Sequence, residues 1–242
     1  MIYSKKLISI AIPAWEYNGF GTECLEYSFV KMKEQLFEDF DVVISDQSTD
    51  YKIRNLCNSW RRKLRIKYVH NKEIGNAAQN LNNALNHCDG EWIKILCQDD
   101  YLAYSDSLLK ISRIINDIST VHKDKYNWLA TGYIHTHDRK HFLNYHMPQL
   151  NPNIAVVNTI GTPSCTTYRN TIEKVQFDTE LSYAYDCEYY YRYIQKYGDP
   201  LLSTDVTIVN YLWDKSMTSK INQELINKES QYILEKHGGL VI

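Results

Sequence analysis

Residues 92–100 read Trp92-Ile93-Lys94-Ile95-Leu96-Cys97-Gln98-Asp99-Asp100, an apolar run that ends at two adjacent carboxylates. Its short apolar part is typical of a buried strand. Two neighbouring carboxylates at the end of a core strand lose hydration and repel each other, so each needs a cation, a donor or a proton. In open α/β sheets, ligands bind outside the carboxyl ends of the strands, where hard oxygens suit Mg²⁺ or Mn²⁺ carrying a diphosphate. A solvated turn that opens the next helix would explain the same residues.

Strands and helices alternate before this run. Short strands are predicted at residues 7–12, 41–45 and 66–70, each followed by apolar residues at helical spacing up to residue 88. Strands that alternate with helices over short loops indicate a parallel sheet with right-handed crossovers. The predicted fold class is therefore α/β, with a Rossmann-like, mostly parallel central sheet flanked by helices.

The pattern loosens after residue 100, but no linker separates the two halves, so we expect a single domain over residues 1–242. A helix starting at Asp186 has strong stop signals at Gly198 and Pro200. The remaining predictions are helices over residues 108–118 and 223–237, strands over 128–133 and 206–212, and loops over 135–165.

Composition excludes several classes of protein. The chain has 242 residues, 44% of them hydrophobic, and a formal net charge of -2, which disfavours a nucleic-acid partner. No apolar run approaches the length of a transmembrane segment, and residues 7–12 are too few for the core of a signal peptide. The six cysteines are scattered without a Cys-x-x-Cys pair, which predicts a reduced, cytoplasmic protein.

Four ordered motifs resemble the family 2 glycosyltransferases of GT-A fold. They lie at residues 9–13, 43–50, 75–81 and 90–100, with looser similarity at 177–178, 186–188 and 216–218. Members transfer a sugar from a nucleoside diphosphate to an acceptor, mostly with inversion. The resemblance implies a nucleotide-sugar-binding half over residues 1–103 and an acceptor-binding half over residues 104–242.

The resemblance also implies which residues meet the nucleotide. The first loop would contribute Pro13, Ala14, Trp15 and Glu16. Trp15 would stack on the base, or it caps the core instead. Asp46 resembles the aspartate that accepts a hydrogen bond from uracil; a helix N-cap is its alternative, although Ser48 or Thr49 is available for capping.

The helix expected to face the diphosphate starts with Gly75 and Asn76 and continues with Gln79 and Asn80. Helix N-terminal N–H groups attract anions, and Gly75 permits close backbone approach. The family commonly has arginine where this chain has Gln79. Neutralisation of the diphosphate then depends more on the metal or on Lys72.

The metal ligand implied by the resemblance is Asp99, which aligns with the last carboxylate of the family's Asp-x-Asp motif. Cys97 replaces the first carboxylate, Gln98 is the middle residue, and Asp100 would orient Asp99 or cap the following helix.

A second implied ligand lies near the C-terminal end. Trp213 stands where the family often has a metal-binding histidine, and the neighbouring Asp214 would take that role. By the same resemblance, residues 161–164 would line the acceptor pocket.

Asp186 resembles the catalytic aspartate at the start of the acceptor-side helix. Inversion needs a general base that deprotonates the acceptor hydroxyl, and a carboxylate suits this task. A helix N-cap is the alternative for Asp186, and Glu188 is the substitute candidate for the base.

These residues predict an inverting glycosyltransferase that uses Mn²⁺ or Mg²⁺ and a nucleoside-diphosphate sugar, with UDP favoured by Asp46. Its acceptor would be a glycan, glycolipid or glycoprotein in polysaccharide or glycoconjugate assembly, with peripheral membrane association an open option. A non-catalytic nucleotide- or sugar-binding relative is the main alternative. A sugar-nucleotide nucleotidyltransferase is disfavoured because residues 18–21 lack a basic side chain.

Overall fold

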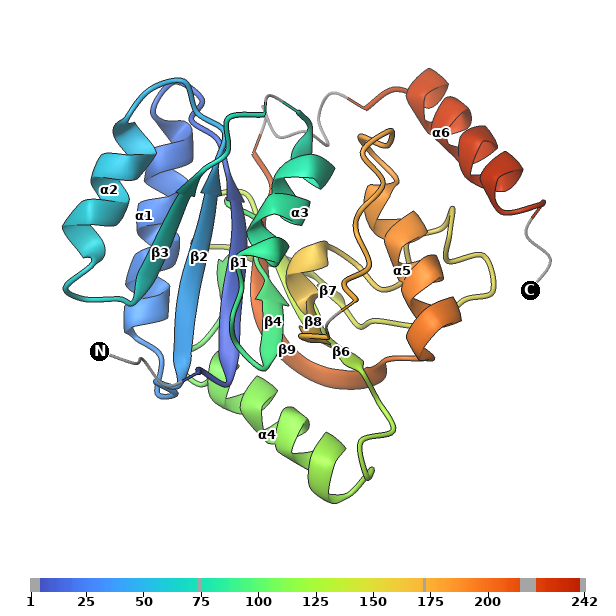
Figure 1. Cartoon of the computed structure of the whole chain (residues 1–242), viewed down its shortest axis with the longest axis horizontal. Coiled ribbons are helices and arrows are strands. Elements are labelled where there is room, and N and C mark those ends of the chain that lie inside the picture. The colour runs from blue at the N-terminus through green and yellow to red at the C-terminus, as the bar shows by residue number, and fades with distance from the viewer. Residues whose placement is uncertain (1–4, 74, 172, 214–220, 240–242) are drawn as a thin grey trace.

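A single sheet runs through the computed structural model, which describes residues 5–73, 75–171, 173–213 and 221–239 (Figure 1). Nine strands among these residues follow the order β3-β2-β1-β4-β8-β6-β9-β5, with β7 paired to β6. The strands are β1 (Ile8–Ala14), β2 (Phe40–Asp46), β3 (Ile66–His70), β4 (Trp92–Ile95), β5 (Tyr101–Leu102), β6 (Trp128–Thr136), β7 (Phe142–His146), β8 (Thr166–Arg169) and β9 (Leu201–Tyr211).

Helices cover both faces of this sheet. They are α1 (Phe20–Lys33), α2 (Lys52–Trp60), α3 (Ala77–Asn86), α4 (Ser107–Thr120), α5 (Tyr185–Tyr197) and α6 (Gln223–Lys236), with a short 3-10 helix, η1 (Pro163–Cys165). Isoleucines at alternate positions of β1 pack with α1, α2 and α4, whereas Ala11 between them packs with α3 and α5. This period of two is what a strand buried on both faces requires.

The first four strands are parallel, and their carboxyl ends meet at one edge. Ala14, Asp46 and His70 occupy one row across β1, β2 and β3. Beyond β4 the sheet is mixed: β8 is antiparallel to β4 and β6, and β9 is parallel to β6 but antiparallel to β5. The predicted α/β fold class of GT-A type is confirmed, and both halves of the chain share the sheet.

Three local predictions were wrong. Residues 135–165 contain β7, whose five residues are all exposed at the sheet edge and so give no alternating signal. Neither Ser48 nor Thr49 caps α2, which begins at Lys52 after Tyr51. Asp100 does not cap the next helix, because β5 intervenes and α4 begins only at Ser107.

Candidate active site

Gln98 ties the first loop to the end of β4. Its Oε1 accepts from the backbone N–H of Trp15 at 2.9 Å, and its Nε2 donates to the carbonyl of Gly21 at 2.8 Å. The Trp15 side chain is 54% exposed, so it does not cap the core. Its indole ring is therefore available for stacking on a base at the carboxyl edge of the sheet.

Asp46 is fully buried at the end of β2. Its two oxygens accept from the backbone N–H of Ser48 and from the hydroxyl of Tyr68, both at 2.8 Å. Since α2 begins at Lys52, the N-cap alternative for Asp46 is wrong. The carboxylate of Glu16 accepts from the N–H of Thr22, in the first turn of α1, at 2.9 Å.

Asn76 caps α3 and also reaches the acceptor half. Its Oδ1 accepts from the N–H of Gln79 at 3.1 Å, while its Nδ2 donates to the carbonyls of Thr179 and Leu181 at 2.7 and 2.9 Å. A Cβ at Gly75 would collide with the side-chain amide of Gln79. In this structure Gly75 therefore makes room for Gln79.

Asn80 holds the strand ends together. It is buried, accepts from the Ser45 hydroxyl at 2.6 Å and donates to the carbonyl of Ala14 at 3.0 Å. Pro13 lies inside β1, opposite Ser45 on β2. Pro13, Ala14 and Asn80 were predicted to bind the nucleotide. In the structure they join the carboxyl ends of β1 and β2 by strand pairing and hydrogen bonds.

Asp100 is held from two sides while Asp99 has a lighter set of contacts. Asp100 accepts from Asn210 Nδ2 at 2.7 Å and from the Thr162 hydroxyl at 3.2 Å. Asp99 accepts from Trp213 Nε1 at 3.2 Å. Burial raises the pKa of both carboxyls, and the charge of Asp99 helps to raise the pKa of Asp100 to about 7.

Aromatic rings border this pair of carboxylates. Trp213 stacks on Phe20 with ring centroids 3.7 Å apart, and Tyr17 links Trp213 to Trp15 at 6.2 and 5.7 Å. The indole that replaces the expected histidine therefore fixes one oxygen of Asp99 and joins an aromatic wall.

Asp186 lies in the first turn of α5. The helix begins at Tyr185 after Ala184, so the N-cap alternative for Asp186 is wrong. Its Oδ2 accepts from Asn158 Nδ2 at 2.7 Å, and its Oδ1 accepts from the N–H of Cys187 at 2.7 Å. Burial raises the pKa of Asp186 to about 6, which suits a proton acceptor near neutral pH.

Asp186 and Asp100 belong to one region. The pKa values of Tyr133 and Tyr185 are raised by burial first and, among neighbouring groups, by the charges of both carboxylates. The loop over residues 158–162 connects them directly, because Asn158 bonds Asp186 at one end and Thr162 bonds Asp100 at the other. The carboxylates of Asp186 and Asp100 are therefore held by opposite ends of one short loop.

Glu188 has a different environment. It is fully buried and accepts from Arg192 Nε at 2.6 Å, from Lys236 Nζ at 2.8 Å and from His237 Nε2 at 3.1 Å. Burial acts to raise the pKa of Glu188, but the hydrogen bonds from Arg192 and Lys236 outweigh it and hold the pKa low. Residues two apart on a helix do not share a face, so Glu188 joins an ion-pair cluster rather than the region of Asp186.

Glu188→Gln is expected to lower the free energy of unfolding at pH 7 by about 2 kcal/mol, because it leaves Arg192 and Lys236 without their buried partner. The partners are partly exposed, which places the loss at the lower end for buried pairs. A lowered pKa stabilises the fold above the unfolded value, and this contribution is lost as pH falls through the folded value. Urea unfolding should therefore show the variant and the parent converging in strong acid; an equal deficit at all pH values would contradict this.

A model of glycosyl transferase family 2 matches residues 9–176, which include the carboxyl ends of β1 to β4 and the 158–162 loop. The chain belongs to glycosyl transferase family 2.

One curated relative and two solved structures of similar fold resemble this chain. Glycosyltransferase GlyG of Streptococcus pneumoniae serotype 4 is 24% identical over 96 residues, covering 39% of this chain and 31% of the relative. S. aureus TarS 1–349 in complex with UDP-GlcNAc has a TM-score of 0.70 at 18% identity, covering 96% of this chain and 66% of TarS. Mannosyltransferase PcManGT from Pyrobaculum calidifontis, with GDP-Man and Mn²⁺, has a TM-score of 0.60 at 16% identity, covering 89% and 60%.

The chain thus spans about a third of the curated relative and under two thirds of either structure. No helix in the described part of this family 2 chain is long and apolar enough to cross a bilayer.

The donor set at β4 fits a metal held mainly by phosphate. No three His, Cys, Asp or Glu residues within the described ranges are grouped to enclose an ion. Mg²⁺ and Mn²⁺ nevertheless bind through one or two carboxylates plus the phosphates of a substrate, and Asp99 can supply such a carboxylate. Burial raises the pKa of the Cys97 thiol, so it stays neutral and is a poor ligand. Asp214, the other predicted ligand, lies outside the described residues.

Sequence reasoning missed several side chains that bind the carboxylates of this family 2 site or the backbone beside them. Asn158 and Asn210 bind Asp186 and Asp100 from distant loops and strands. Glu229 binds the backbone before Asp186 from α6. Asparagines and a glutamate without a motif give no local signal, because only the tertiary fold brings them to the carboxylates.

Proposed function

We propose that this protein is an inverting glycosyltransferase that transfers a sugar from UDP-sugar to a glycan or glycoconjugate acceptor. The observation that supports it best is that one short loop bonds Asp186 at one end and Asp100, the neighbour of Asp99, at the other, in a family 2 fold. Family membership supplies the class of reaction, and the carboxylates supply groups for both ends of it. UDP is favoured because TarS, solved with UDP-GlcNAc, matches this fold with a TM-score of 0.70, against 0.60 for PcManGT with GDP-Man.

The donor would lie along the carboxyl edge of β1, β2 and β4. Trp15 would stack on the base and Asp46 would help to define its pocket. The start of α3 would face the diphosphate, where the N–H groups of the helix N-terminus favour an anion. Asp99 would hold Mn²⁺ or Mg²⁺, which when bound offsets charge on the diphosphate.

Asp186 would act as the general base. As the acceptor oxygen forms its bond to the anomeric carbon, the bond from that carbon to the diphosphate oxygen breaks and the hydroxyl proton passes to Asp186. The hydrogen bond from Asn158 orients the carboxylate during this step.

The rate of transfer should depend on the ionisation of Asp186. Its pKa is raised to about 6, and only the ionised form accepts a proton. We therefore expect kcat/KM to be constant above about pH 7 and to fall tenfold per pH unit well below about pH 6. A pH–rate profile with saturating Mn²⁺ measures this, and a rate independent of pH between 5 and 8 would argue against Asp186 as the base.

Calorimetric titration of UDP with and without Mn²⁺ tests the donor site, and UDP release from a panel of UDP-sugars tests turnover. Metal-dependent binding with turnover supports the proposal. Binding of UDP-sugars without turnover for any acceptor would favour a non-catalytic relative, which the replacements at Cys97, Gln79 and Trp213 motivate. Binding of GDP or CDP alone would change the nucleotide but keep the enzyme class.

The setting we propose is glycan, glycolipid or glycoprotein assembly in the cytoplasm, with peripheral contact to a membrane where the acceptor is lipid-linked. The six cysteines, all unpaired in the structure, agree with a reducing compartment. Fractionation of cells that produce the protein would check this placement.

A further inference from the structure

One carboxylate from α6 binds three consecutive backbone N–H groups just before α5. Glu229 is buried, with Oε1 accepting from Ser182 at 2.8 Å and Oε2 accepting from Tyr183 at 2.9 Å and Ala184 at 2.8 Å. A carboxylate that accepts several backbone N–H groups fixes their orientation strongly, because each bond is charge-assisted. The fixed backbone ends two residues before Asp186.

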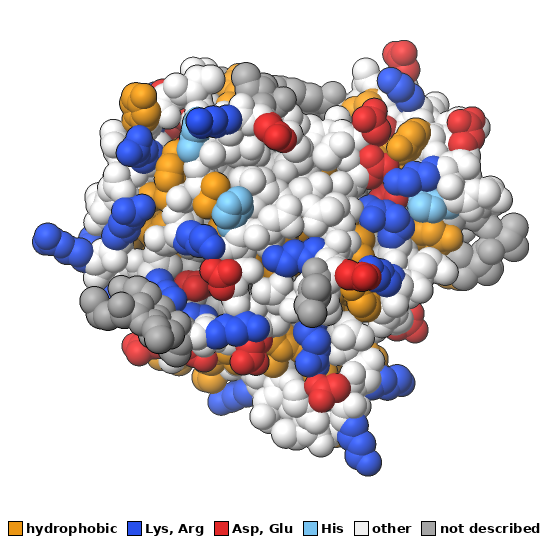
Figure 2. Space-filling model, in the orientation of Figure 1, with side chains coloured by type: hydrophobic (Ala, Val, Ile, Leu, Met, Phe, Trp, Pro, Cys, Tyr) orange, Lys and Arg blue, Asp and Glu red, His pale blue; other side chains and the backbone are white. Residues whose placement is uncertain are grey.

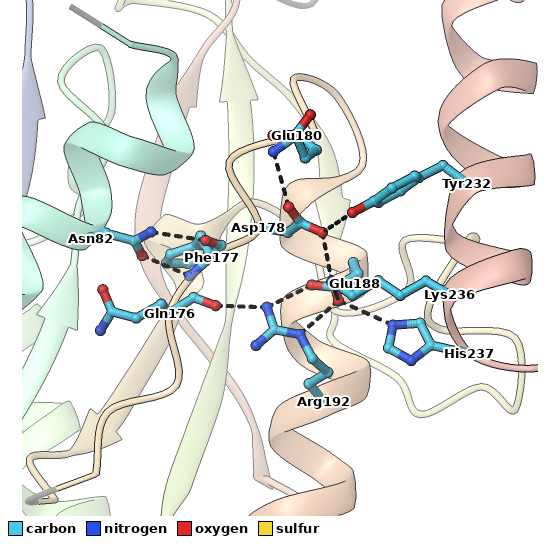
Figure 3. Close-up of polar contacts among 10 residues, drawn as sticks. All are labelled: Asn82, Gln176, Phe177, Asp178, Glu180, Glu188, Arg192, Tyr232, Lys236 and His237. Carbon is cyan, nitrogen blue, oxygen red and sulfur yellow. Dashed lines mark hydrogen bonds and ion pairs between the residues drawn. The ribbon is translucent and has the colours of Figure 1, made fainter. Parts of the chain in front are cut away.

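The other side of the same segment is held by α3. Asn76 donates to the carbonyls of Thr179 and Leu181. Asn82 exchanges two hydrogen bonds with the backbone of Phe177, at 2.8 and 2.6 Å, as Figure 3 shows. The segment 177–184 is therefore bonded to α3 on one side and to α6 on the other. The helix α3 starts at the carboxyl edge of the sheet.

Ion pairs and a hydrogen bond hold α6 against Asp178 and α5, and so restrict the movement of Glu229. Asp178 accepts from Tyr232 at 3.0 Å and from Lys236 at 2.6 Å, and Lys236 also donates to Glu188 on α5 (Figure 3). Acidic and basic side chains lie close together on the α5 and α6 side of the molecule (Figure 2). These contacts along α6 thus keep the carboxylate of Glu229 within hydrogen-bonding distance of the N–H groups of residues 182–184.

We infer that Glu229 is a positioning residue, which acts from α6 through the backbone of residues 182–184 to set the orientation of the Asp186 carboxylate. This inference rests on the proposed function of Asp186 as the base. A hold on the preceding backbone matters because a base displaced by about 1 Å can lose about a hundredfold in rate. The outer helix α6 is then part of what makes transfer efficient.

Glu229 also acts on Asp186 through its charge. The titratable groups that share the surroundings of Asp186 are Tyr133, Cys165, Tyr183, Tyr185, Cys187, Tyr190 and Glu229. The phenols and thiols all have raised pKa values and stay neutral near pH 7. Burial is the main cause of the raised pKa of Asp186, and the negative charge of the Glu229 carboxylate adds to it. A further carboxylate, Asp100, is bonded by the other end of the 158–162 loop.

Two substitutions separate geometry from charge. In Glu229→Gln the amide oxygen can still accept from Tyr183 and Ala184, so only the charge and the bond from Ser182 are lost. In Glu229→Ala all three bonds are lost. Glu235→Gln is the matched control, since it makes the same change on the exposed face of α6, where Glu235 bonds Gln231.

NMR of protein with isotopically labelled aspartate carboxyls measures the titration of Asp186, assigned by its loss in Asp186→Asn. We expect Glu229→Gln to lower this pKa by about half a pH unit, and Glu235→Gln to leave it unchanged. Hydrogen exchange should become at least about tenfold faster at the amides of residues 182–184 in Glu229→Ala. In Glu229→Ala, kcat should fall about tenfold or more, while the KM for the donor stays within about twofold of the parent value. Glu229→Gln should keep most of the parent's kcat at pH 8.

An unchanged Asp186 titration in both variants would overturn the inference, and so would faster exchange of the three amides with no change in that titration or in kcat. The NMR and exchange measurements need no substrate, so an unchanged titration of Asp186 can overturn the inference before the donor and acceptor are known. Failure of the proposed function has a separate signature, because Asp186→Asn would then keep its turnover whatever Glu229 does.

Discussion

Asp186→Asn is expected to lower kcat by about 10² to 10⁴ while leaving the affinity for UDP within about twofold. The amide oxygen can still accept from the N–H of Cys187, so the first turn of α5 keeps its geometry, but the bond from Asn158 is lost and the amide cannot take the acceptor proton. Burial of this carboxyl, which raises its pKa to about 6, makes its ionised form a strong enough base for the task. Release of UDP from a UDP-sugar measures kcat, and calorimetry measures binding.

Asp199→Asn is the control for this prediction. It makes the same change at an exposed position just beyond the other end of α5, so turnover should match that of the parent. Full activity of Asp186→Asn would remove Asp186 from the mechanism. Loss of UDP binding together with turnover would instead place Asp186 in the donor site.

Asp99→Ala should weaken Mn²⁺-dependent binding of UDP by about a hundredfold or more, equivalent to about 2.7 kcal/mol, and abolish measurable turnover. Asp100 is already bound by Asn210 and Thr162, so it cannot swing to replace the missing ligand. The residual affinity should no longer respond to Mn²⁺. Calorimetric titrations at several Mn²⁺ concentrations measure both effects.

Asp89→Ala is a suitable control, because Asp89 is exposed and forms an ion pair with Lys67 away from the carboxyl edge. If Asp99→Ala still bound UDP more tightly in Mn²⁺ than without it, the metal would be held elsewhere, and Asp99 would lose its assigned role.

The architecture was predictable where the signal is local. The strand expected over residues 66–70 has the same bounds as β3, and the stop signals at Gly198 end α5 as expected. Periodicity and turn residues act over a few positions, so one segment is enough to show them. The strand β7 lacks this signal, since all its side chains are exposed.

The site was less predictable. Strand order brings residues to one edge of the sheet, but it does not determine which partners their side chains bind there. The ends of β1, β2 and β4 meet as the parallel pattern implies. Asn80, however, bonds Ser45 and Ala14, and Glu188 bonds cations from a helix about fifty residues later. Such choices depend on partners far along the chain, which a motif cannot contain.

The place of β9 in the sheet has a consequence for how the protein is made. This strand lies between β6 and β5, which are both synthesised well before it. The parallel block of β1 to β4 can assemble while the chain is still emerging, but β5 has no partner and one long side of β6 stays open until residue 211 has left the ribosome. Chains that stop before this point expose a bare sheet edge and invite association with one another, so premature termination should yield aggregates rather than small soluble fragments.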